Sequence, residues 1–263
     1  MASTLLVPTY RLDLAYDGTG FHGYASQPGL RTVQGELEEA LQRQVGDVVT
    51  VVAGRTDRGV HASGQVVCFS HPSQIDAEGV MRSLNSQLGD EIAVLDLQEV
   101  DDDFHARFSA TARAYRYEIL NRPVHDPLRS RTTWHLQEPL DVKAMNVAAG
   151  LLIGSHDFAS LCRKKEGTST ERHVMWAGWR RLDDVVELSI GANAFCHQMV
   201  RSIVIVLVDV GRGRIDASDV KSILTAEDRR KGRGVAPPHG LTLVRVGYPG
   251  EPFDPPDWIT RTP

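Results

Sequence analysis

Apolar and polar side chains alternate from Tyr10 to Tyr16, which predicts a β-strand with one buried face. From 33 to 45 apolar residues recur every four positions, which predicts a helix capped by Thr32 and closed by Gly46. The same reading then predicts strands over 48–53 and 65–70, a helix over 75–88 and a strand over 91–97. The first part of the chain therefore has the order β-α-β-β-α-β.

The later part of the chain repeats this order loosely. Its patterns predict strands over 112–120, 174–180, 185–190 and 241–246, and helices over 142–152 and 218–224. The stretch 197–210 is rich in β-formers but long enough for a buried helix. Helical spacing of Met199, Ile203 and Leu207, followed by Gly211, favours the helix.

Two such halves indicate an α+β protein in which helices pack on mixed, mostly antiparallel sheets. We expect an N-terminal α+β half over residues 1–104 and a C-terminal α+β half over residues 105–249. The proline-rich segment 250–263 is expected to form an extended tail.

Composition adds that this is an ordinary globular chain. It has 263 residues, of which 41% are hydrophobic and 24% charged. Its longest aliphatic run, Ile203 to Val208, is too short to span a bilayer, and the N-terminus lacks the features of a secretory signal. We therefore expect no membrane segment and a cytoplasmic protein. The three cysteines lie far apart and show no zinc-ligand spacing, so reduced thiols and no metal are expected.

Charge is unevenly distributed along a chain whose formal net charge is −5. Arginine dominates the stretch 104–134, which contains Arg107, Arg113, Arg116, Arg122, Arg129 and Arg131. Further basic clusters occupy 163–165 and 229–233. Each cluster taken alone is more typical of a solvated face. Together they predict a segregated basic surface and favour nucleic acid as the partner, because arginine suits phosphate contacts and base stacking.

The candidate chemistry lies in residues 53–69, AGRTDRGVHASGQVVCF. Gly54 and Gly59 permit a tight backbone that exposes the residues between them. Arg55 would keep Asp57 ionised if the two side chains pair, and an ionised, positioned aspartate can act as a nucleophile or a base. The alternative is a structural turn in which Asp57 accepts backbone N–H bonds. Nucleotide-hydrolysis, dinucleotide, zinc-peptidase and hydrolase-elbow motifs do not occur in the sequence.

The stretch AGRTDRGVHASGQV closely resembles the signature motif of the tRNA pseudouridine synthase A family. Other stretches resemble that family in the same order along the chain: YDGTGFHGY at 16–24, TVQGELEEAL at 32–41, FHARFSATARAYRYEI at 104–119, GSHDF at 154–158, FCHQMVRSIV at 195–204 and GLTLVRVGYP at 240–249. The resemblance extends from about Tyr10 to Pro249.

The resemblance implies specific residue roles. Asp57 matches the catalytic aspartate, and Arg55 matches the loop arginine that helps to displace or hold the RNA. Tyr115 matches the aromatic residue that stacks on the target base, and Arg201 matches the arginine that pairs with the catalytic carboxylate. Without the resemblance, Tyr115 reads as a packed strand tyrosine and Arg201 as a structural ion pair.

The resemblance also implies the fold and the reaction. The fold would be the pseudouridine synthase fold, in which two α+β halves join their sheets across a central cleft. The protein would act as a homodimer. The substrate would be uridine in the anticodon stem-loop of tRNA at positions 38, 39 and 40, isomerised without a cofactor or a metal. Sequence leaves open whether Asp57 attacks C1′ or removes the 2′ proton.

The chain departs from the family pattern at five positions. Tyr24 and Ala25 replace the usual tryptophan and glutamine, Arg58 replaces the alanine after the aspartate, and Cys196 and Gln198 replace commoner residues around His197. Two other hypotheses remain. One is a non-catalytic tRNA-binding protein that keeps the fold. The other is a carboxylate-dependent glycosidase or phosphoryl-transfer enzyme, although this loop offers no second carboxylate beside Asp57.

Overall fold

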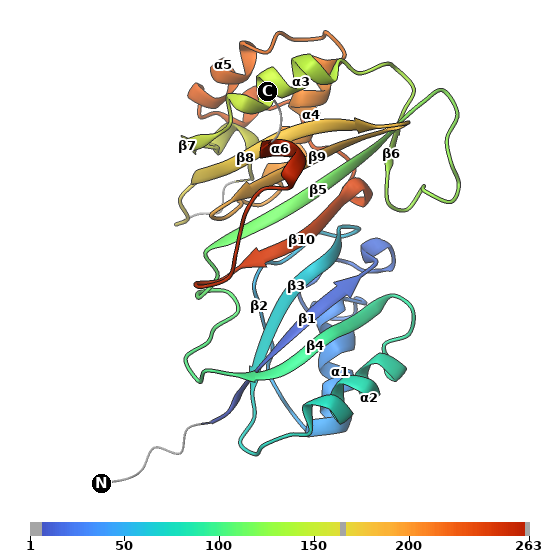
Figure 1. The fold of residues 1–263 in the computed structure, drawn as a ribbon, viewed down its shortest axis with the longest axis vertical. Helices are drawn as coiled ribbons and strands as arrows, with labels where there is room; N and C mark the ends of the chain where they lie inside the picture. The colour runs from blue at the N-terminus through green and yellow to red at the C-terminus, as the bar shows by residue number, and fades with distance from the viewer. Residues whose placement is uncertain (1–6, 164–166, 261–263) are drawn as a thin grey trace. The chain divides into compact units, whose positions relative to one another are not determined.

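A computed structural model describes residues 7–163 and 167–260 of the chain (Figure 1). Of the basic cluster expected at 163–165, Lys164 and Lys165 lie outside the described residues, as do the first six residues and the last three. The chain forms two compact units, Met1–Thr111 with Leu243–Gly250, and Ala112–Thr242 with Glu251–Pro263. We call these the N-terminal unit and the C-terminal unit.

The boundary at 111 differs from the predicted boundary at 104, and the reason lies in local hydrogen bonds. The hydroxyl of Tyr248 donates to the carbonyl of Ala106 at 2.7 Å, and Thr111 N donates to the Gly247 carbonyl at 2.9 Å. These bonds attach residues 104–111 and 243–250 to each other, so both segments belong to the N-terminal unit. Sequence periodicity does not register such a long-range pairing.

The N-terminal unit combines two helices with strands of one sheet. Its elements are β1 (Thr9–Tyr16), η1 (Gly18–Gly20), α1 (Val33–Val45), β2 (Val51–Val52), β3 (His61–Ser70), α2 (Ala77–Gln87), β4 (Ile92–Val100) and most of β10 (Leu241–Gly247). The strand order is β4-β1-β3-β10, with β2 beside β3. Strand β1 runs antiparallel to both neighbours, with Leu12 opposite Val67 and Leu97, and α2 packs on β4 and α1 (Figure 1).

Capping residues set the helix ends in this unit. The Oγ1 of Thr32 accepts a hydrogen bond from Gly35 N at 3.2 Å, and Gly46 ends α1 with φ +82°, as the sequence predicts. Asp76 caps α2 in the same way, which is why that helix begins at Ala77. The predicted strand 48–53 shortens to β2, Val51–Val52, which lies opposite Cys68 and Val67 of β3, and Ala53 N donates to the Val66 carbonyl just beyond its end.

The C-terminal unit is also α+β. Its elements are β5 (Ala112–Asn121), β6 (Trp134–Leu136), α3 (Val142–Gly150), β7 (Gly154–Asp157), η2 (Ala159–Leu161), β8 (Glu171–Leu182), β9 (Val185–Ala192), α4 (Met199–Gly211), α5 (Asp219–Thr225), η3 (Arg229–Lys231), η4 (Pro238–Gly240) and α6 (Asp257–Thr260). Strand order is β5-β9-β8-β7, antiparallel except for β6, which lies parallel beside β5. The α+β class and the mixed, mostly antiparallel sheets are confirmed.

Helix α4 forms where the sequence was ambiguous. Most of its residues are buried, and α3 packs against both α4 and β8. The expected extended tail contains the single turn α6 instead. Trp258 and Ile259 of α6 lie over β8, where both are 3.5 Å from the position a Cβ would take on Gly178. Trp258 also stacks beneath the guanidinium of Arg180, with 4.7 Å from Cζ to the ring centre.

Candidate active site

Asp57 lies in the loop that connects β2 to β3, at a half-buried position between two exposed arginines, Arg55 and Arg58. The backbone turns tightly after the aspartate, because Val60 N donates to the Asp57 carbonyl at 3.1 Å and Gly59 adopts φ +77°. That left-handed conformation is one that glycine adopts with little strain. The loop therefore keeps Asp57 partly open to solvent while its neighbours are anchored.

Two buried side chains attach this loop to the sheet. The Thr56 hydroxyl shares a hydrogen bond of 2.8 Å with the hydroxyl of Tyr16 on β1. The carboxamide of Gln65 on β3 donates from Nε2 to the Gly54 carbonyl at 2.8 Å and to the Tyr16 hydroxyl at 3.2 Å. Burial raises the pKa of Tyr16 to about 12, so its hydroxyl keeps its proton at neutral pH.

The stretch YDGTGFHGY packs against the other side of the loop. Tyr24 N donates to the Thr56 carbonyl at 3.1 Å. Gly23 adopts φ +98°, and a Cβ placed on it would lie 3.0 Å from the Thr56 carbonyl oxygen and 3.4 Å from the carbonyl carbon of Asp57. A Cβ on Gly18 would lie 2.0 Å from the Val60 carbonyl oxygen. The backbone around Asp57 is thus enclosed by residues that leave no room for larger side chains.

Tyr115 projects from β5 in the C-terminal unit, opposite Ile190 of β9. Its side chain is largely buried, at 9% exposure. The ring of Phe195 meets it edge to face, with 5.1 Å between centroids and an angle of 90°. Such an aromatic pair fixes the orientation of both rings.

Arg201 lies on α4 and is half-buried. Its Nε donates to the Ala236 carbonyl at 2.8 Å, and Ala236 N donates back to the Arg201 carbonyl at 3.0 Å. Burial raises the pKa of Tyr117, and the positive charge of Arg201 opposes that rise. Tyr115 and Tyr117 are two residues apart on one strand and point to the same face. Arg201 and Tyr115 therefore lie on the same side of the C-terminal sheet.

The structure thus gathers the candidates in two groups, Asp57 with Arg55 on one loop, and Tyr115 with Arg201 on one face. The pairing of Arg55 with Asp57 remains a prediction. Sequence reasoning assigned no role to Tyr16, Gly23, Gln65 or Phe195, although all of them fall within the motif stretches. Their position within these stretches was the one sequence feature that could have singled them out. Their roles depend on hydrogen bonds and contacts that the motif letters do not specify.

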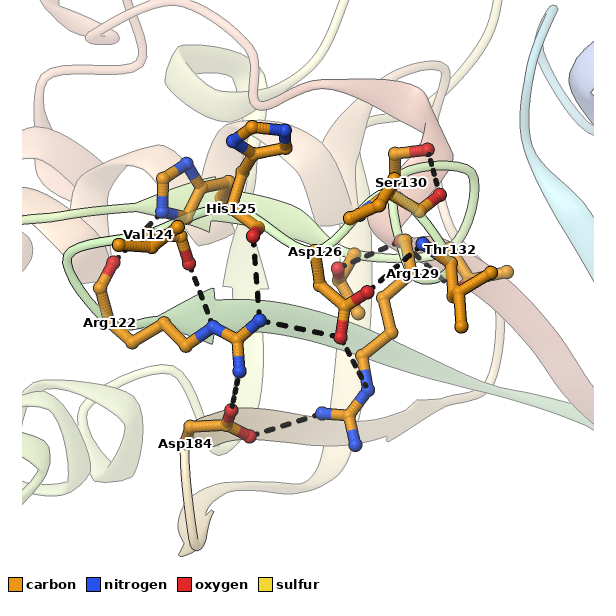
Figure 2. Close-up of polar contacts among 12 residues, drawn as sticks. Arg122, Val124, His125, Asp126, Arg129, Ser130, Thr132 and Asp184 are labelled. Carbon is orange, nitrogen blue, oxygen red and sulfur yellow. Dashed lines mark hydrogen bonds and ion pairs between the residues drawn. The ribbon is translucent and has the colours of Figure 1, made fainter.

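The arginine-rich segment 122–133 is a loop between β5 and β6, and ion pairs occupy part of its charge (Figure 2). Arg122 and Arg129 both pair with Asp184, at 2.9 and 3.1 Å, and both also pair with Asp126. Asp184 is distant from these arginines in the sequence, so the local charge pattern could not predict the ion pairs. Arg116 pairs with Glu118 at 3.2 Å, so at least three of the six arginines between residues 104 and 134 hold carboxylates of the protein itself.

A family model described as tRNA pseudouridine synthase matches residues 14–109 and 148–249, more than half of the chain. The chain belongs to the tRNA pseudouridine synthase family. The first matched segment includes the Asp57 loop and the residues that anchor it, and the second includes Phe195 and Arg201. Tyr115 lies between the two matched segments.

Relatives named tRNA pseudouridine synthase A are similar over most of their length. The protein from Frankia casuarinae is 46% identical over 246 residues, which cover 92% of this chain and 90% of that protein. The proteins from Brevibacillus brevis and Geobacillus kaustophilus are 44% and 43% identical, and the matches cover 98% and 93% of those proteins. These relatives confirm the expected family.

Among solved structures, the chain is similar to one titled "Crystal structure of the archaeal box H/ACA sRNP Nop10-Cbf5 complex", with a TM-score of 0.37 and 11% identity. The match covers 92% of this chain and 49% of that chain. A second, a Cbf5-Nop10-Gar1 complex, gives a TM-score of 0.36.

Two of the departures from the family pattern have a plain structural setting. Tyr24 is completely buried, with its ring 6.1 Å from that of Tyr16, so it packs behind the loop of Asp57. Arg58 is exposed.

None of the helices in the described ranges has the length and apolarity that crossing a bilayer requires.

Proposed function

We propose that this protein isomerises uridine to pseudouridine in tRNA and that Asp57 is its catalytic carboxylate. The observation that carries the proposal is the anchoring of the loop around Asp57. Thr56 is bonded through its hydroxyl to Tyr16 and through its carbonyl to Tyr24 N, while Asp57 itself stays half-buried. A structural turn does not need this support from a strand and a neighbouring loop, whereas a reacting group must be held in one position.

The reaction breaks the N1–C1′ bond of uridine, turns the uracil and forms a C5–C1′ bond. It involves no net oxidation or reduction. An ionised Asp57 close to the ribose would either attack C1′ or remove the 2′ proton, and both routes need the carboxylate charged and fixed in position. In this proposal Arg201 provides the guanidinium that holds the carboxylate, as the family resemblance implies.

A uridine within a stem is inaccessible, so the enzyme must extrude it at a cost of a few kcal/mol. We propose that the extruded base stacks on Tyr115, which recovers about 1–3 kcal/mol. The edge of Phe195 supports this role, because it holds the Tyr115 ring in one orientation before RNA binds. The exposed Arg55 contacts the RNA beside the reacting nucleotide.

The finer features follow from the resemblance. We infer that the substrate nucleotides are positions 38, 39 and 40 of the anticodon stem-loop, and that the protein works in the cytoplasm as a homodimer without a cofactor. Mapping new pseudouridines base by base in an unmodified tRNA transcript tests the positions. Sedimentation over a range of protein concentrations tests the dimer.

The decisive experiment compares Asp57→Asn with Asp96→Asn. Asp96 is an exposed aspartate on β4 of the same unit, so the control makes the same chemical change away from the loop. We expect Asp57→Asn to abolish pseudouridine formation while tRNA affinity stays within a few fold, and Asp96→Asn to behave as the wild type. Full turnover by Asp57→Asn would overturn the catalytic role. Binding without turnover in the wild type would favour the non-catalytic alternative.

A further inference from the structure

Two of the three cysteines lie next to each other in the C-terminal unit. Cys162 follows η2 and is completely buried, whereas Cys196 lies in the loop between β9 and α4 and is partly exposed. A backbone hydrogen bond of 3.0 Å from Arg163 N to the His197 carbonyl joins the two segments one residue beyond each cysteine. The Cys196 thiol also donates to the Thr170 carbonyl oxygen at 3.8 Å. The two segments are therefore fixed relative to each other.

The two thiols act directly on each other. A side-chain hydrogen bond joins Cys162 and Cys196, and it raises the pKa of Cys162 and lowers the pKa of Cys196 to about 7. Burial raises both pKa values, the guanidinium of Arg172 lowers both, and the carboxylate of Asp157 raises both. The contact with Cys162 therefore favours the thiolate of Cys196, which is the reactive form of cysteine.

Arg172 contributes a positive charge at this place. Its Nε is buried and has no hydrogen-bond acceptor within the described part of the chain, although Nη1 donates to the Glu171 carbonyl at 2.6 Å. A buried guanidinium N–H without an acceptor is costly. A thiolate nearby offsets that cost electrostatically.

The third cysteine shows what an ordinary buried thiol looks like in this protein. Cys68 lies on β3 at 4% exposure, and its sulfur accepts a hydrogen bond from Ala106 N at 3.3 Å. Burial raises its pKa. Cys68 is therefore an internal control for every measurement of thiol reactivity.

We propose that Cys162 and Cys196 form a peroxide-reactive dithiol site, in which Cys196 is the attacking thiol and Cys162 resolves the product into a disulfide. The site lies outside the proposed chemistry on uridine. The site is nevertheless close to Tyr115. The ring of Phe195 contacts Tyr115, and Phe195 directly precedes Cys196 in the sequence.

Both steps balance with hydrogen peroxide as the oxidant. The Cys196 thiolate attacks one peroxide oxygen, an S–O bond forms, the O–O bond breaks, and hydroxide leaves and takes up a proton as water. Sulfur is oxidised to sulfenic acid and peroxide is reduced. Cys162 then gives up its proton and attacks the Cys196 sulfur, so that an S–S bond forms, the S–O bond breaks and a second water leaves. A thiol reductant reverses the disulfide.

The test uses the intact, reduced protein and reads protein mass alone, so its outcome is independent of tRNA modification. Without any substitution, iodoacetamide at neutral pH should label Cys196 about tenfold or more faster than Cys68, because the rate follows the thiolate fraction. After peroxide treatment the protein should lose the mass of two hydrogen atoms, and peptide mapping should find Cys162 linked to Cys196.

Variants then separate the roles of the two thiols, with circular dichroism used to check that each is folded. Cys162→Ser should accumulate sulfenic acid at Cys196, which dimedone captures. Cys196→Ser should give neither the disulfide nor the adduct, and Cys68→Ser should match the wild type. Labelling of Cys196 no faster than Cys68, or oxidation of Cys196 in the wild type without a link to Cys162, would overturn the proposal.

Discussion

The hydroxyl of Tyr16 lies 2.8 Å from the hydroxyl of Thr56, the residue that immediately precedes Asp57. Tyr16 belongs to β1, a strand paired on both sides, so this bond transmits the position of the sheet to the loop. The backbone at Asp57 is therefore set by the core of the N-terminal unit. The predictions that follow test this arrangement and the groups proposed to work with it.

Removing the Tyr16 hydroxyl should slow turnover more than it weakens RNA binding. In Tyr16→Phe, Thr56 and Gln65 each lose a buried partner, and we expect the free energy of unfolding to fall by about 1–3 kcal/mol. Because the loop loosens, kcat should fall by about tenfold, with tRNA affinity little changed. Tyr10→Phe is the matched control. Tyr10 is buried on the same strand, and its hydroxyl accepts a hydrogen bond from Ile75 N at 3.1 Å. This bond lies away from the Asp57 loop. Equal kcat values for the two variants would contradict the claim.

Adding one methyl group at Gly23 should disturb the Asp57 loop. Both Gly23 and Gly29 have positive φ, +98° and +72°, so alanine at either position is strained by about 1–2 kcal/mol. Only Gly23 has neighbours within 4 Å of the new Cβ, the nearest being the Thr56 carbonyl. Thermal unfolding and turnover should therefore show a larger loss for Gly23→Ala, with activity reduced only in that variant. A loss of activity in Gly29→Ala would point to strain alone.

The ring pair of Tyr115 and Phe195 should behave as a unit. We expect Tyr115→Leu to lose about 1–3 kcal/mol of stacking on the extruded base, seen as weaker productive binding of tRNA. Phe195→Leu removes the supporting edge, which is worth about 0.5–1.5 kcal/mol. A double-mutant cycle on kcat/KM should show that the second substitution costs less once the first is present. Strict additivity would mean that Phe195 does not orient Tyr115.

The salt dependence of tRNA binding should distinguish exposed arginines from paired ones. Arg55 is exposed on the loop of Asp57, so Arg55→Ala should reduce the slope of log affinity against log salt by about one. Arg129 already pairs with Asp126 and Asp184, so Arg129→Ala should leave that slope unchanged and lower the free energy of unfolding by at most about 1 kcal/mol. An equal change in slope for both variants would show that the ion pairs open when RNA binds.

Glu118 should make stability fall as pH rises above its ordinary pKa of 4.5. Burial raises the pKa of this carboxyl, with the charge of Arg116 opposing the rise. As pH increases through 4.5, the unfolded chain releases this proton first while the folded protein retains it, so unfolding becomes easier. Urea unfolding across this range should show a steeper decline for the wild type than for Glu118→Gln. Parallel curves would mean that Glu118 titrates alike in both states.

Local signals in the sequence predict much of this fold. Thr32 and Gly46 bound α1 because each supplies a specific capping interaction. Short strands without alternation, such as β6 and β7, were not predicted, since they exist only through pairing with β5 and β8. The division of the chain depends on bonds such as Tyr248 to Ala106, across 142 residues, which no local pattern encodes.

The candidate site also combines residues that the sequence indicates with residues whose roles only the structure shows. Asp57 and Arg55 were proposed from the composition of their loop, and Tyr115 and Arg201 from the family resemblance, and the roles of all four stay predictions. Gln65 and Gly23 stand in the same motifs, but their roles consist of contacts with backbone atoms of the loop. Such contacts depend on where two segments meet in space. The pairing of Asp184 with the arginine-rich loop was missed for the same reason.

The carboxamide of Gln65 has a consequence for how this protein can diverge. Its one nitrogen serves two oxygens, the carbonyl of Gly54 and the hydroxyl of Tyr16. Glutamate has the same shape, yet it would turn an oxygen toward the Gly54 carbonyl and bring a charge into the interior. We therefore expect glutamate to be excluded at position 65 by a backbone carbonyl, an atom that no substitution elsewhere in the chain can turn into a donor.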